Sequence, residues 1–109
     1  MNADIVNNLK VDDEVEVISR GKQFTTYPKW FENNAPDLLL EYLEYNNRKN
    51  VVIVTGIVVA MAPHENYEKY GTICAVKSGR YTMLIMQSGL KKVHTYDVEL
   101  IWGVNYGYE

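Results

Sequence analysis

The chain has 109 residues, a formal net charge of −3 at neutral pH and a single cysteine. This length leaves room for one hydrophobic core and hardly for two, so we expect a single domain over residues 1–109. The apolar fraction of 47% and the charged fraction of 23% are ordinary for a globular protein and exclude global disorder. Because Cys74 is alone, no disulfide can form within the chain, which favours a reducing compartment.

The N-terminal residues lack the basic and apolar segments of a signal peptide. The longest apolar run, over residues 51–62, is interrupted by Thr55 and Gly56 and is too short to cross a bilayer. We therefore expect a cytoplasmic protein that makes no membrane contact.

The first predicted element is a half-buried strand within residues 9–18, where three valines alternate with charged residues. Asp12 and Asp13 are expected to form a turn just before it, since aspartate side chains readily accept hydrogen bonds from nearby backbone N–H groups. Residues 20–22 are expected to end the strand.

Residues 25–49 change to a helical pattern. A short helical turn is expected over residues 27–31, and a second helix runs from about residue 35 to residue 47. Glu44 and Arg48 lie four residues apart on its polar stripe, a spacing that predicts an ion pair.

After residue 50 the pattern returns to β. Nearly continuous β-branched residues over 51–61 predict a central strand with a bend at Gly56. The remaining expectations, in chain order, are a loop over 63–70, a hairpin of strands 71–77 and 81–86, a turn at 88–90, and one or two closing strands over 91–102.

Five or six short strands with one early helical excursion are typical of a small closed barrel. Residues 9–17, Leu-Lys-Val-Asp-Asp-Glu-Val-Glu-Val, resemble the opening of Src-homology-3-like barrels, where an apolar-x-Val-Gly-Asp-x-Val-x-Val pattern leads the first strand. Residues 56–60 resemble their second strand, and residues 88–93 are similar to the short turn before their last strand. Asp12 stands where that family usually has glycine.

The resemblance implies a mainly β fold, a small Src-homology-3-like barrel of five or six antiparallel strands with a helical insertion after the first strand, at about residues 25–49. The short chain, its many tyrosines and this insertion also resemble, in style, small phage-encoded accessory proteins.

The sequence contains few candidate catalytic or metal-binding residues. His64 and Glu68 form the best candidate pair of metal ligands, and two ligands do not make a zinc site. Cys74 falls in the middle of a predicted strand, where an inert buried thiol is expected. No nucleophile elbow and no phosphate-binding glycine loop occur. We expect a protein that is not an enzyme and that needs neither a metal nor another cofactor.

Aromatic residues are the most informative excess, with nine tyrosines, two tryptophans and two phenylalanines. Tyrosine combines an apolar ring with a hydrogen-bonding tip and is enriched at recognition surfaces. In a barrel of the predicted type, the excursion at residues 20–50 and the loop at 63–70 lie along one edge. The predicted binding residues on this edge are Lys22, Tyr27, Trp30, His64, Tyr67 and Tyr70. Trp30 has a second interpretation, in which it pins the helical insertion to the core.

The leading functional hypothesis is a non-enzymatic interaction module that binds a protein partner through this edge, as a phage-type modulator of a host protein. One alternative is a sequestering protein that holds a nucleotide between aromatic rings and Lys22, Arg20 or Lys69. A nucleic-acid-binding barrel is less favoured, because the basic residues are scattered singly or in pairs and form no stripe. The apolar residues near the C-terminus, at 102–108, favour a homodimer.

Overall fold

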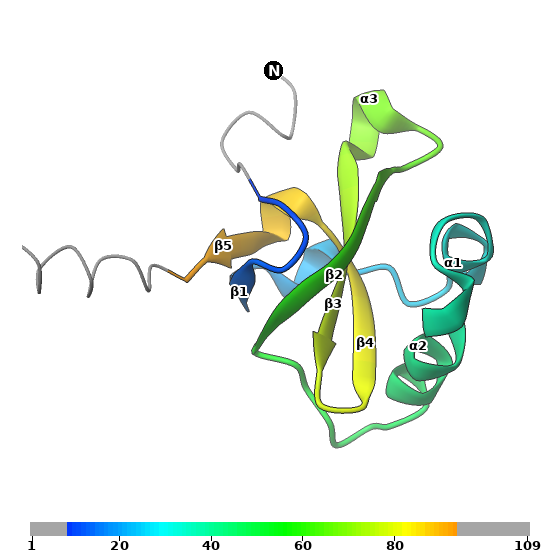
Figure 1. Ribbon diagram of the computed structural model, residues 1–109, viewed down its shortest axis with the longest axis vertical. Helices are drawn as coiled ribbons and strands as arrows, with labels where there is room; N and C mark the ends of the chain where they lie inside the picture. Colours follow the sequence, from blue (N-terminus) through cyan, green and yellow to red (C-terminus); the bar gives the residue numbers. More distant parts are fainter. Residues whose placement is uncertain (1–8, 94–109) are drawn as a thin grey trace, which may run out of the picture.

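A computed structural model describes residues 9–93 of the chain. Its strands form one antiparallel five-stranded sheet in the order β4-β3-β2-β1-β5 (Figure 1). In chain order the elements are β1 (Glu14–Val17), η1 (Arg20–Lys22), α1 (Pro28–Asn34), η2 (Pro36–Leu38), α2 (Leu39–Asn46), β2 (Thr55–Pro63), α3 (Tyr67–Tyr70), β3 (Thr72–Ser78), β4 (Tyr81–Met86), η3 (Gln87–Gly89) and β5 (Leu90–Lys92), where η marks a 3-10 turn.

The mainly β, antiparallel character and the helical insertion after the first strand are confirmed. The last strand, β5, pairs with the first, with Val17 opposite Leu90. The sheet is open, with β4 and β5 as its two edges. Residues between β1 and α1 approach the free edge of β4, where Gln23 forms a bridge with Ile85 and the Phe24 N–H donates to the Leu84 carbonyl over 2.8 Å.

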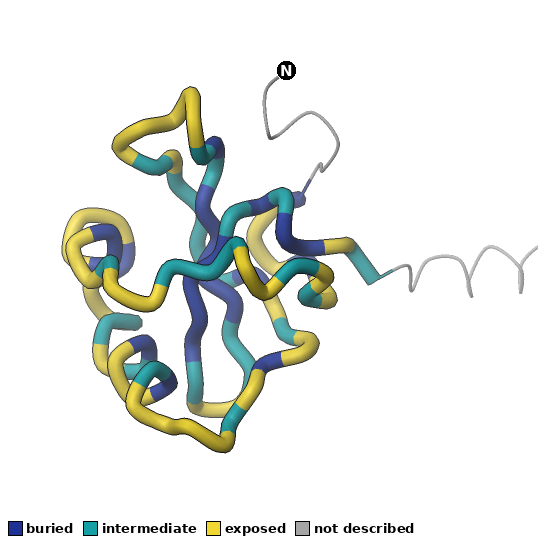
Figure 2. Tube along the Cα trace, turned by 180° about the vertical axis from the view of Figure 1, so that it is seen from behind, coloured by how far each residue is buried: buried dark blue, intermediate teal, exposed yellow. Residues whose placement is uncertain are grey.

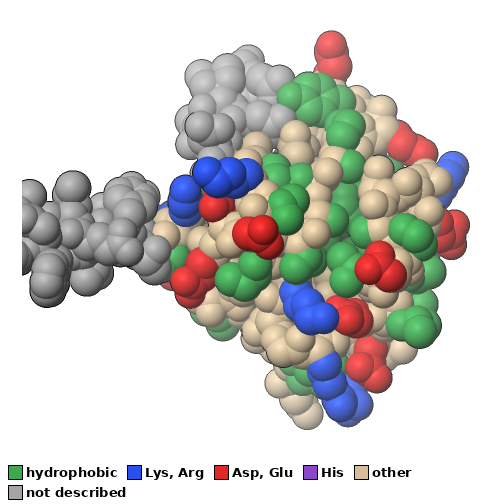
Figure 3. Space-filling view, in the orientation of Figure 1, with side chains coloured by type: hydrophobic (Ala, Val, Ile, Leu, Met, Phe, Trp, Pro, Cys, Tyr) green, Lys and Arg blue, Asp and Glu red, His purple; other side chains and the backbone are tan. Residues whose placement is uncertain are grey.

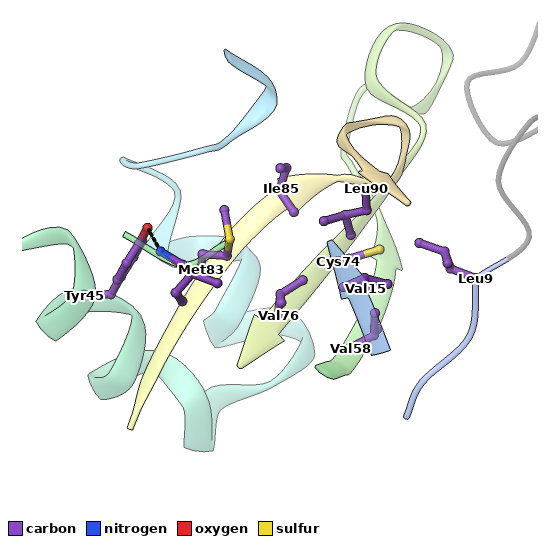
Figure 4. Packing of buried hydrophobic residues seen from close by; sticks show 10 residues of the cluster. Leu9, Val15, Tyr45, Val58, Cys74, Val76, Met83, Ile85 and Leu90 are labelled. Atoms are coloured by element: carbon purple, nitrogen blue, oxygen red, sulfur yellow. Dashed lines mark hydrogen bonds between the residues drawn. The ribbon is translucent and has the colours of Figure 1, made fainter. Parts of the chain in front are cut away.

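The strands β3 and β4 are buried on both faces, which explains their nearly continuous apolar sequences. Successive side chains of a strand point to opposite faces, so neighbours enter different cores. Cys74, Val76, Met83 and Ile85 pack with Val15 of β1 and Val58 of β2 in a first core (Figure 4). The alternate residues Ile73, Ala75 and Leu84 pack against the helices in a second core. Figure 2 shows the buried residues concentrated along these central strands.

The helices α1 and α2 lie together beside the β3–β4 hairpin (Figure 1) and contribute the large buried rings of Trp30, Phe31 and Tyr42. A polar contact also fastens α2 to the sheet. The Glu41 carboxylate accepts hydrogen bonds from the Lys77 ammonium at 2.9 Å and from the Thr82 hydroxyl at 2.8 Å.

Burial alone would raise the pKa of the Glu41 carboxyl. The hydrogen bonds from Lys77 and Thr82, with the positive charge of Lys77, outweigh burial and lower that pKa below its ordinary value. Glu41 is therefore held as a carboxylate between α2 and the sheet.

Several sequence-based expectations need correction. Residues 51–54 form no strand, because the Tyr45 hydroxyl accepts from the Ile53 N–H at 3.2 Å while the Val52 and Val54 side chains face solvent. The loop predicted at 63–70 contains a helical turn, α3, and the first helix continues to Asn34. The hairpin of β3 and β4 is confirmed. Of the closing strands, β5 ends at Lys92, and residues 94–102, like the apolar segment 102–108, lie outside the described residues.

The predicted ion pair between Glu44 and Arg48 is also wrong for the described residues. The Glu44 carboxylate lies 3.8 Å from the Arg80 guanidinium, at the turn between β3 and β4. Arg48 follows the end of α2 and is exposed.

The turn before β1 forms where the sequence predicts it. Asp12 has a φ of 82°, in the left-handed region that favours glycine. Its N–H donates to the Val58 carbonyl at 2.7 Å, and the Asp13 carboxylate accepts from the Lys10 N–H at 3.0 Å. Asp12 thus adopts a glycine-like backbone at the position where the Src-homology-3-like pattern has glycine.

Candidate functional site

Four aromatic rings from two distant segments meet between α3 and the segment that leads into α1. Phe24 and Tyr27 precede α1, whereas His64 follows β2 and Tyr70 ends α3. The His64 ring lies 4.4 Å from Tyr70, 4.9 Å from Tyr27 and 5.3 Å from Phe24, measured between ring centroids. Phe24 also lies 5.9 Å from Tyr27 and 5.5 Å from Tyr70. We call Phe24, Tyr27, His64 and Tyr70 the aromatic surface, because each is partly accessible to solvent.

The first half of the aromatic surface is positioned by a buried tyrosine of α2. The Tyr42 hydroxyl donates to the Phe24 carbonyl at 2.6 Å and accepts from the Tyr27 N–H at 3.0 Å. Its side chain is fully buried, and burial raises the pKa of the hydroxyl above its ordinary value, against smaller opposing effects of hydrogen bonds. Tyr42 therefore fixes the backbone from which the Phe24 and Tyr27 rings project.

The second half is positioned by a closed turn between β2 and β3. The His64 N–H donates to the Gly71 carbonyl at 3.0 Å, and the Gly71 N–H donates to the Tyr67 carbonyl at 2.7 Å. Asn66 caps α3 through its side-chain oxygen, which accepts from the Lys69 N–H at 3.4 Å. Gly71 has a φ of 69°, so a side chain there would strain this closure.

His64 is uncharged at neutral pH. Burial among the rings lowers the pKa of its imidazole below the ordinary value, against a smaller raising effect of Glu65. Its Nδ1 atom accepts a hydrogen bond from the Asn66 N–H at 2.8 Å, which requires an unprotonated nitrogen. The remaining ring nitrogen, Nε2, therefore carries the proton.

Charged groups flank the aromatic surface. The Lys69 ammonium lies 5.1 Å from the centroid of the Tyr70 ring, within the range of a cation–π interaction. Lys29 and Glu65 approach to 3.6 Å, and because both side chains are largely exposed this pair contributes little to stability.

The structure brings together three of the predicted site residues, Tyr27, His64 and Tyr70, and places Tyr67 beside them in α3, with 37% of its surface exposed. Trp30 is only 1% exposed and packs on Phe31, so the core interpretation holds and it is not a surface residue. Lys22 donates from its ammonium to the Ser88 hydroxyl of η3 at 3.1 Å.

Sequence reasoning missed Phe24. It stands just before the predicted insertion and follows the residues expected to end the first strand, so no periodic pattern marked it. Its spacing of three from Tyr27 was the one available signal, and the pairing of the Phe24 backbone with β4 is what brings its ring to the site.

Within residues 9–93, no three His, Cys, Asp or Glu side chains are grouped so as to hold a metal ion. None of the helices in that range is both long and apolar enough to cross a membrane. On the face shown in Figure 3, basic and acidic side chains are interspersed. The chain matches no protein-family model, no curated protein and no solved structure.

Proposed function

We propose that the protein is a non-enzymatic interaction module that binds a protein partner through the aromatic surface. The observation that carries the proposal is the packing of four partly accessible rings, from two segments, around the uncharged His64. The proposed partner is a host protein, in keeping with the chain's resemblance in style to small phage-encoded accessory proteins.

The composition of this surface suits a protein partner. Aromatic side chains dominate the energetics of protein interfaces, since they bury much apolar area at a small cost in side-chain entropy. The hydroxyls of Tyr27 and Tyr70 and the His64 Nε2–H provide polar groups at the edges of the rings. Lys69 and Glu65 add charges of both signs at the rim, as in typical interfaces.

Hydrogen bonds within the chain hold the backbone around the rings, and this favours tight binding. Tyr42 holds one segment and the Asn66–Gly71 turn holds the other. A surface that is already ordered loses less conformational entropy on association.

We further propose that the sheet belongs to a small Src-homology-3-like barrel. Three features support this: β5 pairs with β1, the Gln23 and Phe24 backbone reaches the free edge of β4, and Asp12 has a glycine-like φ. Hydrogen exchange tests the closing contact. We expect slow exchange of the Phe24 amide, comparable with the amides shared by β3 and β4, and exchange as fast as in a loop would contradict closure.

The functional proposal is tested by affinity capture from a host lysate, comparing the native chain with Tyr67→Ser and with Leu40→Ser. Tyr67 lies in α3 beside the aromatic surface, whereas Leu40 is 79% exposed on α2 and is the matched control. We expect a protein that is retained by the native chain and by Leu40→Ser and lost with Tyr67→Ser.

Thermal unfolding of both variants provides the folding control, since neither side chain is buried. Equal retention by both variants, with native unfolding midpoints, would contradict the proposal.

A further inference from the structure

A second, separate feature is a hollow of about 240 Å³ between η1 and the end of α2. It is lined by Arg20, Gln23 and Thr25 on one side and by Asn46 and Arg48 on the other, with Val51 and Val52 forming an apolar wall. It shares no residue with the aromatic surface.

Two arginines, Arg20 and Arg48, and no acidic residue line the hollow. Among the described residues, the ion pairs join carboxylates to Lys29, Lys77, Arg80 and Lys92, and include neither Arg20 nor Arg48. Glu44, the carboxylate nearest to Arg48 in sequence, is paired with Arg80 instead. The hollow is therefore lined by two arginines that form no ion pair within the described part of the chain.

The hollow has ordered walls. The Gln23 N–H donates to the Arg20 carbonyl at 3.2 Å, and the Asn46 side-chain amide donates to the Thr25 carbonyl at 3.1 Å, which joins the two sides. The carbonyls at the end of α2 carry partial negative charge, which would oppose an anion. Part of that charge is offset because the N–H groups of Asn47 and Arg48 donate to carbonyls of the last turn.

We propose that this hollow binds a small molecule that carries a phosphate group. A guanidinium group is charged at all physiological pH values and presents a planar set of donors that matches the oxygens of a phosphate. The Thr25 hydroxyl adds a neutral donor, and Val51 and Val52 offer contact for the carbon atoms of the ligand. Since drug-sized sites occupy roughly 300–1,000 Å³, the hollow suits free phosphate or a phosphorylated sugar better than a dinucleotide.

The test is isothermal titration calorimetry of the full chain with inorganic phosphate, with ribose 5-phosphate and with unphosphorylated ribose, at ionic strength held constant with sodium chloride. We expect saturable binding of ribose 5-phosphate and no binding of ribose. If inorganic phosphate binds as tightly as ribose 5-phosphate, the phosphate group is the whole ligand. If inorganic phosphate binds more weakly than ribose 5-phosphate, the sugar also contributes to binding.

Arg20→Gln and Arg48→Gln should each weaken binding by roughly tenfold or more, as expected for the loss of hydrogen bonds to a charged group. Arg80→Gln is the matched control, because Arg80 is exposed and paired with Glu44 outside the hollow, and it should keep the native affinity. Absence of saturable binding by both phosphate compounds, or an equal loss in all three variants, would overturn the proposal.

Discussion

Replacing Tyr42 with phenylalanine removes one oxygen atom and tests how the aromatic surface is held. In the native chain this hydroxyl serves both the Phe24 carbonyl, at 2.6 Å, and the Tyr27 N–H, at 3.0 Å. The phenylalanine ring fills the same buried space, so the change leaves two backbone groups without their partner and creates almost no cavity.

A buried polar group that loses its partner costs about 1–3 kcal/mol. The two backbone groups are partly buried, so the lower end of that range applies to each, and the free energy of unfolding should fall by about 2 kcal/mol in total. For a domain near 100 residues this corresponds to a drop of roughly 8 °C or more in the unfolding midpoint. The hydrogen exchange of the Tyr27 amide should also accelerate.

Tyr45→Phe is the matched control. The Tyr45 hydroxyl accepts a hydrogen bond from the Ile53 N–H at 3.2 Å. Tyr45→Phe therefore leaves one backbone group without its partner, against two for Tyr42→Phe, and should lower the free energy of unfolding by less. The loss in free energy of unfolding is measured for each variant by thermal and urea unfolding, with circular dichroism as the signal. Equal destabilisation, or a larger effect of Tyr45→Phe, would refute the positioning role of Tyr42.

Three further outcomes follow from particular residues. The pKa of His64 is lowered in the folded chain, so the unfolded chain binds more protons as the pH decreases. The free energy of unfolding should therefore fall below a pH of about 6.5. His64→Gln should flatten this dependence in unfolding curves measured from about pH 7.5 to about pH 5. Gly56→Ala places a methyl group 2.5 Å from the Lys77 carbonyl oxygen and should destabilise by about 1–3 kcal/mol in urea unfolding, whereas Gly21→Ala, with open space around it, should change little. Asp12→Gly should be more stable than Asp12→Ala by about 1 kcal/mol, because its φ of 82° strains a side chain, and equal unfolding midpoints would contradict that strain.

The sequence predicts strands best where periodicity or turn chemistry is strong. The alternation before Val17 and the glycine at position 79 mark β1 and the β3–β4 hairpin, and both form as expected. Residues 51–54 fail for a physical reason. Their β-branched side chains favour a strand, but the Ile53 N–H is taken by the Tyr45 hydroxyl, a tertiary contact that local propensity does not contain.

The candidate site is only partly readable from the sequence. The resemblance to Src-homology-3-like barrels predicts that the segments holding Tyr27, His64 and Tyr70 lie along one edge. Trp30 and Tyr70 are both aromatic residues in short helices, and only the packing of α1 against β3 and β4 makes one buried and the other accessible. Phe24 reaches the site through a backbone hydrogen bond to Leu84, which no local pattern predicts.

Site-specific photo-cross-linking measures the central claim most directly, by placing a photoreactive phenylalanine analogue at Tyr67 or at Leu40 of the full chain. Both positions are exposed, and they differ in that Tyr67 lies in α3 beside the aromatic surface and Leu40 lies on α2. We expect light-dependent conjugation of one host protein to the chain labelled at position 67, and much less conjugation to the chain labelled at position 40. The conjugate at position 67 should be lost when Tyr27 and Tyr70 are also replaced by serine in a chain that remains folded. Conjugation at position 40 that equals or exceeds conjugation at position 67 would contradict the claim that the aromatic surface binds the partner.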